Sequence, residues 1–298
     1  MDATTLADRF VVLVVSVVYR GCAIPVAWTV LPATIPHAWR EEGVRLLSLL
    51  KPAIPKTMVV IVLADRGLYA RWLFQHIVRL GWHPFLRINA GAKFRPVGSY
   101  HFSWLSSFVP HEGRWWRGQD TAFASPECRL ECTLLARGET SSAEPWFILT
   151  DLPPTASDAC WYGLRTWSEQ GFKITKRAGW QWQRTRMTDP RRAERLWLAV
   201  AVATLWLLSV GGEADDTIPE STFLDVTNPL GQAQRTRQAT RLRLVSLFRR
   251  GWGLVVAALL NGDPLPLPGA FKPEPWPDVS QCTRRDDAAG ETFSHVAA

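Results

Sequence analysis

Four side chains between residues 162 and 176 have the types and the spacing of a site that binds a metal ion and a phosphate group. Tyr162, Arg165 and Glu169 lie at positions i, i+3 and i+7, which a helix places on one face, and Lys176 follows them. A carboxylate can hold a cation, while a guanidinium and a phenol can bind phosphate oxygens. A plainer alternative is a solvated amphipathic helix, in which Arg165 and Glu169 form an ion pair worth about 0.3–0.5 kcal/mol.

Asp65 is a second candidate because it ends an uninterrupted apolar run over residues 58–64. Such a run is typical of a central strand covered on both faces. The carboxyl ends of strands are where open α/β sheets place catalytic groups and ligands. The alternative is structural: Asp65 then only caps the helix that we expect to begin near Tyr69.

The segment that follows Glu169 is basic and contains tryptophans, as expected along a DNA track. Its cations are Lys173, Lys176, Arg177, Arg184 and Arg186, and its indoles are Trp180 and Trp182. The whole chain has 34 Lys and Arg against 27 Asp and Glu, a formal net charge of +7 and a pI near 9.5. This balance favours a polyanionic partner over an acidic one.

Composition bounds the class of protein. With 298 residues, of which 47% are hydrophobic, the chain can build one large domain or two ordinary ones, and disorder is excluded for most of its length. Five scattered cysteines form no zinc pattern and indicate reduced intracellular thiols. The apolar runs at 10–19 and 196–210 are interpreted as core elements, because the first lacks a signal-peptide cleavage site and the second is short for a membrane span.

The elements that must position these residues follow from the pattern of apolar residues. Residues 10–19 and 23–31 predict two strands joined by a turn, and Pro25 predicts an edge position or a bulge in the second. A helix is expected over 37–50, a strand over 58–64, a helix over 69–80 and a strand over 84–88. This order describes a crossover within a mixed sheet.

Residues 90–145 change in character and predict a β-rich insertion. A strand is expected at 146–150, a helix capped by Ser157 or Asp158 that runs to about 170, and a long helix over 189–210. A basic, partly helical segment follows at 235–260, and the Pro-rich stretch 263–298 predicts a disordered tail. The expected units are therefore a core in two parts, 1–89 and 146–262, the insertion 90–145 and the tail.

The spacing Tyr-x2-Arg-x3-Glu-x6-Lys resembles the signature of a large branch of bacterial insertion-sequence transposases of the DDE type. Four further segments resemble that branch in order and extend the likeness to roughly residues 1–262: the opening 2–10 with its aspartate, 19–28 as the next strands, 60–67 ending in Asp-Arg-Gly, and 146–152 before the glutamate helix. Residues 246–251, Ser-Leu-Phe-Arg-Arg-Gly, are similar to the end of the family's domain.

The resemblance implies a ribonuclease H-like mixed sheet flanked by helices, with the β-rich insertion before the glutamate helix. It implies that Asp2, Asp65 and Glu169 bind two Mg²⁺ ions, for which Mn²⁺ can substitute. Tyr162, Arg165, Lys173 and Lys176 would hold phosphates near the cut. Double-stranded DNA, as element ends and target, would be the partner of a homodimer in the cytoplasm, associated with the nucleoid and not with a membrane. Trp115 or Trp116 could stack on a flipped base, unless it only packs.

One departure from the family concerns the first aspartate. In the family a DNA-binding region and an apolar strand precede it, whereas here it is residue 2. We therefore expect an N-terminally truncated domain with the first strand nearly absent and Asp2 at a frayed terminus. The main alternative function is a catalytically inert DNA-binding remnant. A structure-selective nuclease on the same fold is a second alternative, against which the Tyr-Arg-Glu-Lys spacing argues.

Overall fold

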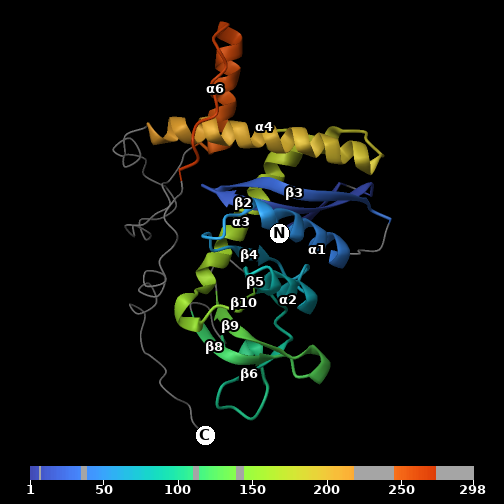
Figure 1. Ribbon diagram of the computed structural model, residues 1–298, viewed down its shortest axis with the longest axis vertical. Coiled ribbons are helices and arrows are strands. Elements are labelled where there is room, and N and C mark those ends of the chain that lie inside the picture. Colours follow the sequence, from blue (N-terminus) through green and yellow to red (C-terminus); the bar gives the residue numbers. More distant parts are fainter. Residues whose placement is uncertain (7, 35–38, 110–113, 139–143, 218–244, 273–298) are drawn as a thin grey trace.

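The computed structural model describes residues 1–6, 8–34, 39–109, 114–138, 144–217 and 245–272. These form two sheets flanked by helices, so the predicted mixed α/β class is confirmed (Figure 1). The strands are β1 Asp2–Leu6, β2 Phe10–Tyr19, β3 Cys22–Pro32, β4 Ile61–Ala64, β5 His83–Arg87, β6 Lys93–Pro96, β7 Ser103–Trp104, β8 Trp115–Ala122, β9 Leu130–Arg137 and β10 Trp146–Thr150. The α-helices are α1 Trp39–Leu50, α2 Arg71–Arg79, α3 Thr166–Lys173, α4 Pro190–Asp216 and α6 Leu247–Asn261.

The first sheet is antiparallel, in the order β1-β2-β3. Arg20 and Gly21, both at positive φ (46° and 83°), make the tight turn between β2 and β3. The register shifts where Ser16 pairs with Pro25, so the bulge that Pro25 predicts is present, and β3 is an edge strand of this sheet.

The first strand is not nearly absent, and this expectation was wrong. β1 has five residues, and Asp2 to Leu6 pair with Val14 to Phe10. The half of β2 that β1 covers is buried, whereas the rest of β2 is partly exposed. Asp2 is 6% exposed and hydrogen-bonded, so it does not lie on a frayed end.

The second sheet has seven strands in the order β4-β5-β10-β9-β8-β6-β7. Its β4–β5 pair is parallel, as the crossover through α2 requires, and its other pairs are antiparallel. The predicted strand over 58–64 is shorter than expected, because β5 begins at His83 and pairs only from Ile61 onward. Met58 and Val59 are exposed, so the apolar run is not covered on both faces.

The two sheets meet at the start of the chain. The Met1 amino group donates to the carbonyl of Leu63 in β4 over 2.7 Å, which puts the first residue of β1 beside the end of β4. One hydrophobic cluster also spans both sheets, because Leu13 of β2 packs in it together with Leu86 of β5 and Phe147 of β10. The acidic residue that opens β1 and the one that follows β4 are thereby neighbours.

The helix predicted from residue 158 to about 170 is a 3-10 helix followed by an α-helix, and a π turn continues it to residue 178. The Asp158 carboxylate caps it by accepting from the Cys160 amide over 2.7 Å, as predicted. Residues 159–165 form a 3-10 helix (η5), α3 follows, and 174–178 form a π turn (η6). A 3-10 helix has three residues per turn and aligns Tyr162 with Arg165, while the α-helix aligns Arg165 with Glu169 four residues later. The change of helix type therefore keeps these three residues on one side.

Helix α4 lies across the first sheet, and α6 projects beyond it (Figure 1). Glu194 ties α4 to β3, because its carboxylate accepts from the Val30 amide over 3.0 Å. α4 extends past the predicted end at 210 and is long and apolar enough to cross a membrane by length and composition, but 56% of its apolar window is buried in the protein. Residues 263–272, part of the expected disordered tail, instead return to α4, where Trp206 and Ser209 donate to the carbonyls of Pro266 and Gly269.

Candidate active site

The guanidinium of Arg165 is hydrogen-bonded to three carboxylates from separate parts of the chain. Its Nη2 donates to Asp2 Oδ2 and to Asp65 Oδ2, each over 3.1 Å, and its Nη1 donates to Glu169 Oε1 over 3.2 Å. Because the two aspartate oxygens share one nitrogen, they cannot be farther apart than twice that distance. The structure thus brings together the three acids that the sequence analysis selected.

Each acid is positioned by a different element. Asp2 opens β1, Asp65 follows the last residue of β4, and Glu169 lies in the first turn of α3. α3 lies close against β3, since a Cβ on Gly171 would be 3.1 Å from the Ala23 carbonyl oxygen. The side-chain exposure rises from 8% for Asp2 through 33% for Asp65 to 55% for Glu169. The site therefore has a buried floor at Asp2 and is open to solvent at Glu169.

In both aspartates, one carboxylate oxygen accepts from the backbone and the other accepts from Arg165. Asp2 Oδ1 accepts from the Ala3 amide over 2.9 Å, and Asp65 Oδ1 accepts from the amides of Gly67 and Leu68 over 3.0 and 3.2 Å. Asp65 therefore closes the turn after β4, whereas α2 begins at Arg71 without a side-chain cap. The capping alternative is correct only in this modified form, and Oδ2 of both residues remains directed at Arg165.

Burial and charge compete in this cluster. Burial raises the pKa of Asp2 although Arg165 opposes the shift, and burial lowers the pKa of the Met1 amino group to about 6. For Arg165, burial lowers the pKa, but Asp2 and the other anionic neighbours outweigh it, so its pKa is raised and it stays charged. Three carboxyl groups meet one guanidinium, so acidic groups are in excess in this cluster. This excess suits a divalent cation.

The carboxylates do not form a finished metal cage. Among the residues that the structure describes, no group of three or more His, Cys, Asp or Glu side chains is arranged to hold a metal ion. Instead, oxygens of all three acids accept hydrogen bonds from one guanidinium, that of Arg165. Asp2, Asp65 and Glu169 therefore fit a cation by their chemistry and their convergence, with Arg165 in the position between them.

Tyr162 lies closer to the core than a phosphate-binding role predicts. Its side chain is 4% exposed and packs edge-on against Trp146, with ring centroids 5.3 Å apart. Its hydroxyl is buried without a hydrogen-bond partner among the described residues. Burial raises the pKa of Tyr162 to about 12, partly offset by the charges of Arg165 and Arg87. The phenol is thus a neutral donor that lies within electrostatic range of the acids.

The basic stretch is only partly as predicted. Lys173 is exposed and Lys176 is half-buried, and neither is bonded to the three acids. Burial, with Arg177 nearby, lowers the pKa of Lys176. The indoles do not line a DNA track: Trp182 is 1% exposed in the core, and Trp180 donates to the Thr204 hydroxyl over 2.9 Å. Their spacing in the sequence could not show that both face inward.

The two tryptophans proposed for base stacking differ. Trp116 packs against Phe108, with ring centroids 4.4 Å apart, and its ring fills the space beside Gly118, so the packing alternative is correct for it. Trp115 is 39% exposed, and the Arg117 guanidinium lies 5.2 Å from its ring centroid. Trp115 is therefore the accessible one of the pair.

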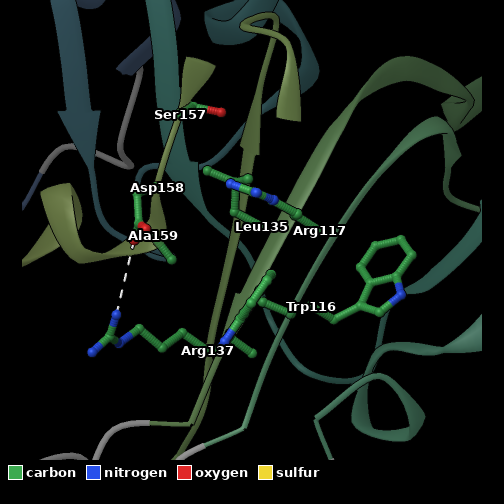
Figure 2. A pocket seen from close by; sticks show the side chains of 9 residues that line it. Trp116, Arg117, Leu135, Arg137, Ser157, Asp158 and Ala159 are labelled. Atoms are coloured by element: carbon green, nitrogen blue, oxygen red, sulfur yellow. Dashed lines mark ion pairs between the residues drawn. The ribbon is translucent and has the colours of Figure 1, made fainter. Parts of the chain in front are cut away.

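A small hollow lies beside these tryptophans, between the β8–β9 pair and the loop before η5. Figure 2 shows Arg137 facing Asp158 there, at 3.9 Å, with the Trp116 ring directed away from the pair. The remaining lining residues are Trp115, Arg117, Leu135, Ala136, Ser157 and Ala159. None of the three acids contributes to this hollow, so it is separate from the candidate active site.

Three described cysteines, Cys22, Cys128 and Cys132, form no disulfide, as expected of reduced thiols. Burial raises the pKa of the Cys132 thiol to about 12, so it is protonated at neutral pH. These thiols take no part in the acidic cluster.

The sequence did not show that a single arginine, Arg165, donates hydrogen bonds to all three acids. The Arg165–Glu169 pair was visible as an i,i+4 spacing, but the contacts with Asp2 and Asp65 span 163 and 100 positions. Arg87 was missed as well; it adds positive charge near Tyr162 and lies 3.9 Å from Glu144. No local pattern marks it, because its place beside the site depends on the pairing of β5 with β10.

A family model described as a transposase DDE domain matches residues 40–206, more than half of the chain. The matched range contains Asp65, Arg165 and Glu169 and begins after Asp2. No curated protein matches the sequence. Asp65 and Glu169 lie within the matched range. Asp2 lies outside it and is assigned to the site because it contacts Arg165.

Proposed function

The chain belongs to the transposase DDE domain family, and we propose that it catalyses metal-dependent cleavage and strand transfer at the ends of an insertion sequence, by cut-and-paste transposition. Its mixed sheet flanked by helices is the ribonuclease H-like fold of such domains. DNA is accordingly its partner. The observation that carries the proposal is the convergence of Asp2, Asp65 and Glu169 on one shared cation, Arg165.

The three acids are our candidates for holding two Mg²⁺ ions, or Mn²⁺ in their place. Carboxylate oxygens are the ligands that these ions prefer, and the excess of acidic groups over cations in the cluster supports binding. When bound, such ions activate the attacking oxygen and stabilise the leaving oxygen of an in-line displacement. Asp2 supplies a buried, fixed ligand, whereas Glu169 at the open rim can move toward the substrate.

The phosphates of DNA would be held by cations around this rim. Arg165 offers a planar guanidinium that matches a phosphate, and Lys173 and Lys176 extend the positive charge along the helix. The Tyr162 hydroxyl, which has no hydrogen-bond partner among the described residues, could donate to a phosphate oxygen that reaches the floor of the site. This division follows the Tyr-x2-Arg-x3-Glu-x6-Lys signature, and we propose on that basis that the chain belongs to the insertion-sequence branch that carries it.

Two further assignments belong to the same proposal. Cutting and joining a pair of element ends requires two active sites, so we propose a homodimer in the paired-end complex. Because such a reaction acts on chromosomal DNA, we propose that the protein works in the cytoplasm with the nucleoid. The strands of residues 90–145 then form the insertion before the glutamate helix, and the exposed Trp115 is the residue to test for base stacking.

The test is cleavage of plasmid DNA that carries the two ends of the element, in Mg²⁺ and in EDTA. We expect nicking and double-strand breaks with Mg²⁺ only, and joining of the released ends to a second plasmid. Asp65→Asn and Glu169→Gln should each reduce the rate more than about 100-fold, since even residues that support metal ligands cost 10- to 100-fold. Tyr100→Ala, a change at a fully exposed side chain, serves as the unchanged control.

The outcomes separate the alternatives. DNA binding without cleavage in either metal would identify an inert DNA-binding remnant. Cleavage that depends on DNA structure rather than on the element ends, without joining, would identify a nuclease. Cleavage that survives both substitutions would contradict the assignment of the acids.

A further inference from the structure

The oxygens that face Arg165 are the ones a metal ion would need. Asp2 Oδ1 and Asp65 Oδ1 accept hydrogen bonds from backbone amides, so Oδ2 is the oxygen of each that is directed at the site. Both Oδ2 atoms accept from Arg165 Nη2. A divalent cation and this guanidinium therefore compete for the same atoms, and two cations in contact with one another repel.

Arg165 is also incompletely satisfied where it lies. Its Nη atoms donate to the three acids, but its Nε is buried and has no partner among the described residues. A guanidinium has five N–H donors in a planar fork that matches the oxygens of a phosphate. Its side chain is 17% exposed, and its outermost partner, Glu169, is 55% exposed, so the open side of the cluster offers a route outward.

We propose that Arg165 is a positioning residue that acts as an internal cation: it holds the three acids together before metal is loaded, and metal binding displaces it toward a DNA phosphate. This inference rests on the proposed function, because it takes the acids as the metal ligands. It adds that metal loading and phosphate binding are coupled through one side chain. Without metal the guanidinium offsets part of the charge of the acids, and with metal it becomes available to the substrate.

If metal displaces Arg165, the metal affinity of the protein depends on this guanidinium in a way that a purely structural arginine would not produce. Removing the guanidinium removes the competitor, so Arg165→Gln should bind divalent metal more tightly than the natural protein while its metal-free form is less stable. A single charge at contact distance shifts a carboxylate's affinity for a cation by roughly 10-fold or more. The probe is Ca²⁺, titrated calorimetrically into the full chain in the absence of DNA.

The matched control is Arg87→Gln. Arg87 lies near enough to influence Tyr162 but contacts none of the three acids. This substitution removes the same formal charge from the neighbourhood, and Arg87 is not among the charges that shift the pKa of Asp2 or of Arg165. We expect it to change Ca²⁺ affinity by less than about 3-fold, because a charge acts strongly on a carboxylate only at close range. An equal gain in both variants would show a general charge effect and overturn the proposal, as would an Arg165→Gln affinity equal to or weaker than that of the natural protein.

Two further measurements test the proposal if the Arg165→Gln variant cannot be used. If Arg165→Gln does not fold without metal, side-chain NMR of the natural protein replaces it: saturating Ca²⁺ should shift the Arg165 guanidinium signals and leave those of Arg87 in place, and unshifted Arg165 signals would overturn the proposal. Asp65→Asn tests the metal site itself. If it retains full Ca²⁺ affinity, the proposed function fails; if it loses Ca²⁺ binding while Arg165 does not move, only the displacement fails.

Discussion

Asp2 Oδ2 accepts a hydrogen bond of 3.1 Å from Arg165 Nη2, and the two residues are 163 positions apart. Their side chains are 8% and 17% exposed, so the ion pair is largely shielded from water. Removing one partner of such a pair leaves a buried charge without compensation, at a cost of about 3–5 kcal/mol. The contact links β1 to the residue that precedes α3, and the stability of the buried acid therefore depends on a nearby cation.

The raised pKa of Asp2 predicts a pH-dependent stability in EDTA. The folded protein holds this proton more tightly than the unfolded chain does, so above the ordinary pKa of 3.8 the folded state carries more protons. The contribution of Asp2 to the free energy of unfolding therefore falls as the pH rises through this window, until both states are ionised. Urea unfolding of the natural protein and of Asp2→Asn between pH 4 and 7 should show Asp2→Asn gaining relative stability with pH. A constant difference would contradict the shift.

Lys173 and Lys176 should each contribute to the binding of DNA phosphates. We expect Lys173→Ala and Lys176→Ala to weaken binding to any duplex sequence and to reduce the slope of log K against log salt by about 0.9 each. Lys56→Ala, at an exposed position before β4, is the control with an unchanged slope. Fluorescence anisotropy at several salt concentrations measures this, and unchanged slopes for both lysines would remove them from the DNA interface.

The crossing of α4 and α6 depends on two glycines. A Cβ on Gly251 would lie 1.9 Å from the Leu207 carbonyl oxygen, and one on Gly211 would lie 2.0 Å from that of Leu247. Gly251→Ala should therefore force the helices apart and lower stability by about 1–3 kcal/mol. Gly253→Ala, where no atom lies within 4 Å, should be neutral or stabilise α6 by up to about 1 kcal/mol. Equal melting temperatures for the two variants would show that the helices do not cross here.

Thiol labelling tests the register of β9. Cys132 is buried and its pKa is raised to about 12, whereas Cys128 is exposed just before the strand. Iodoacetamide at pH 8 should modify Cys128 in the folded protein and leave Cys132 unmodified until the protein is unfolded, because the thiolate is the reactive form. Mass spectrometry of the labelled peptides gives the result. Rapid modification of Cys132 would show that this face of β9 is open.

Local signals predicted several elements well. The strand at 146–150, the Asp158 cap and the bulge at Pro25 each depend on a few neighbouring residues, and each is present. Features that depend on tertiary pairing were harder. The apolar run that begins at Met58 suggested a covered strand, but its length is set by β5, and the sequence does not show where that partner begins.

The candidate site divides in the same way. Spacing selected Arg165 and Glu169, because helical neighbours are fixed by local geometry. Asp2 and Asp65 could be chosen by family resemblance, but only the fold shows that both contact one nitrogen. That Trp182 is buried and Trp180 packs against the core was missed for the same reason, since a tryptophan beside basic residues fits a core as well as a DNA surface.

The most direct test of the central claim, that Asp2, Asp65 and Glu169 are one divalent-metal site, is an anomalous difference map from a crystal of the protein grown in Mn²⁺. We predict metal peaks among the three carboxylates, one for each of the two proposed ions and within about 2.0–2.6 Å of carboxylate oxygens, and a guanidinium of Arg165 that has left its position between the acids. A map without a peak at the acids, with Arg165 still bonded to all three, would contradict it.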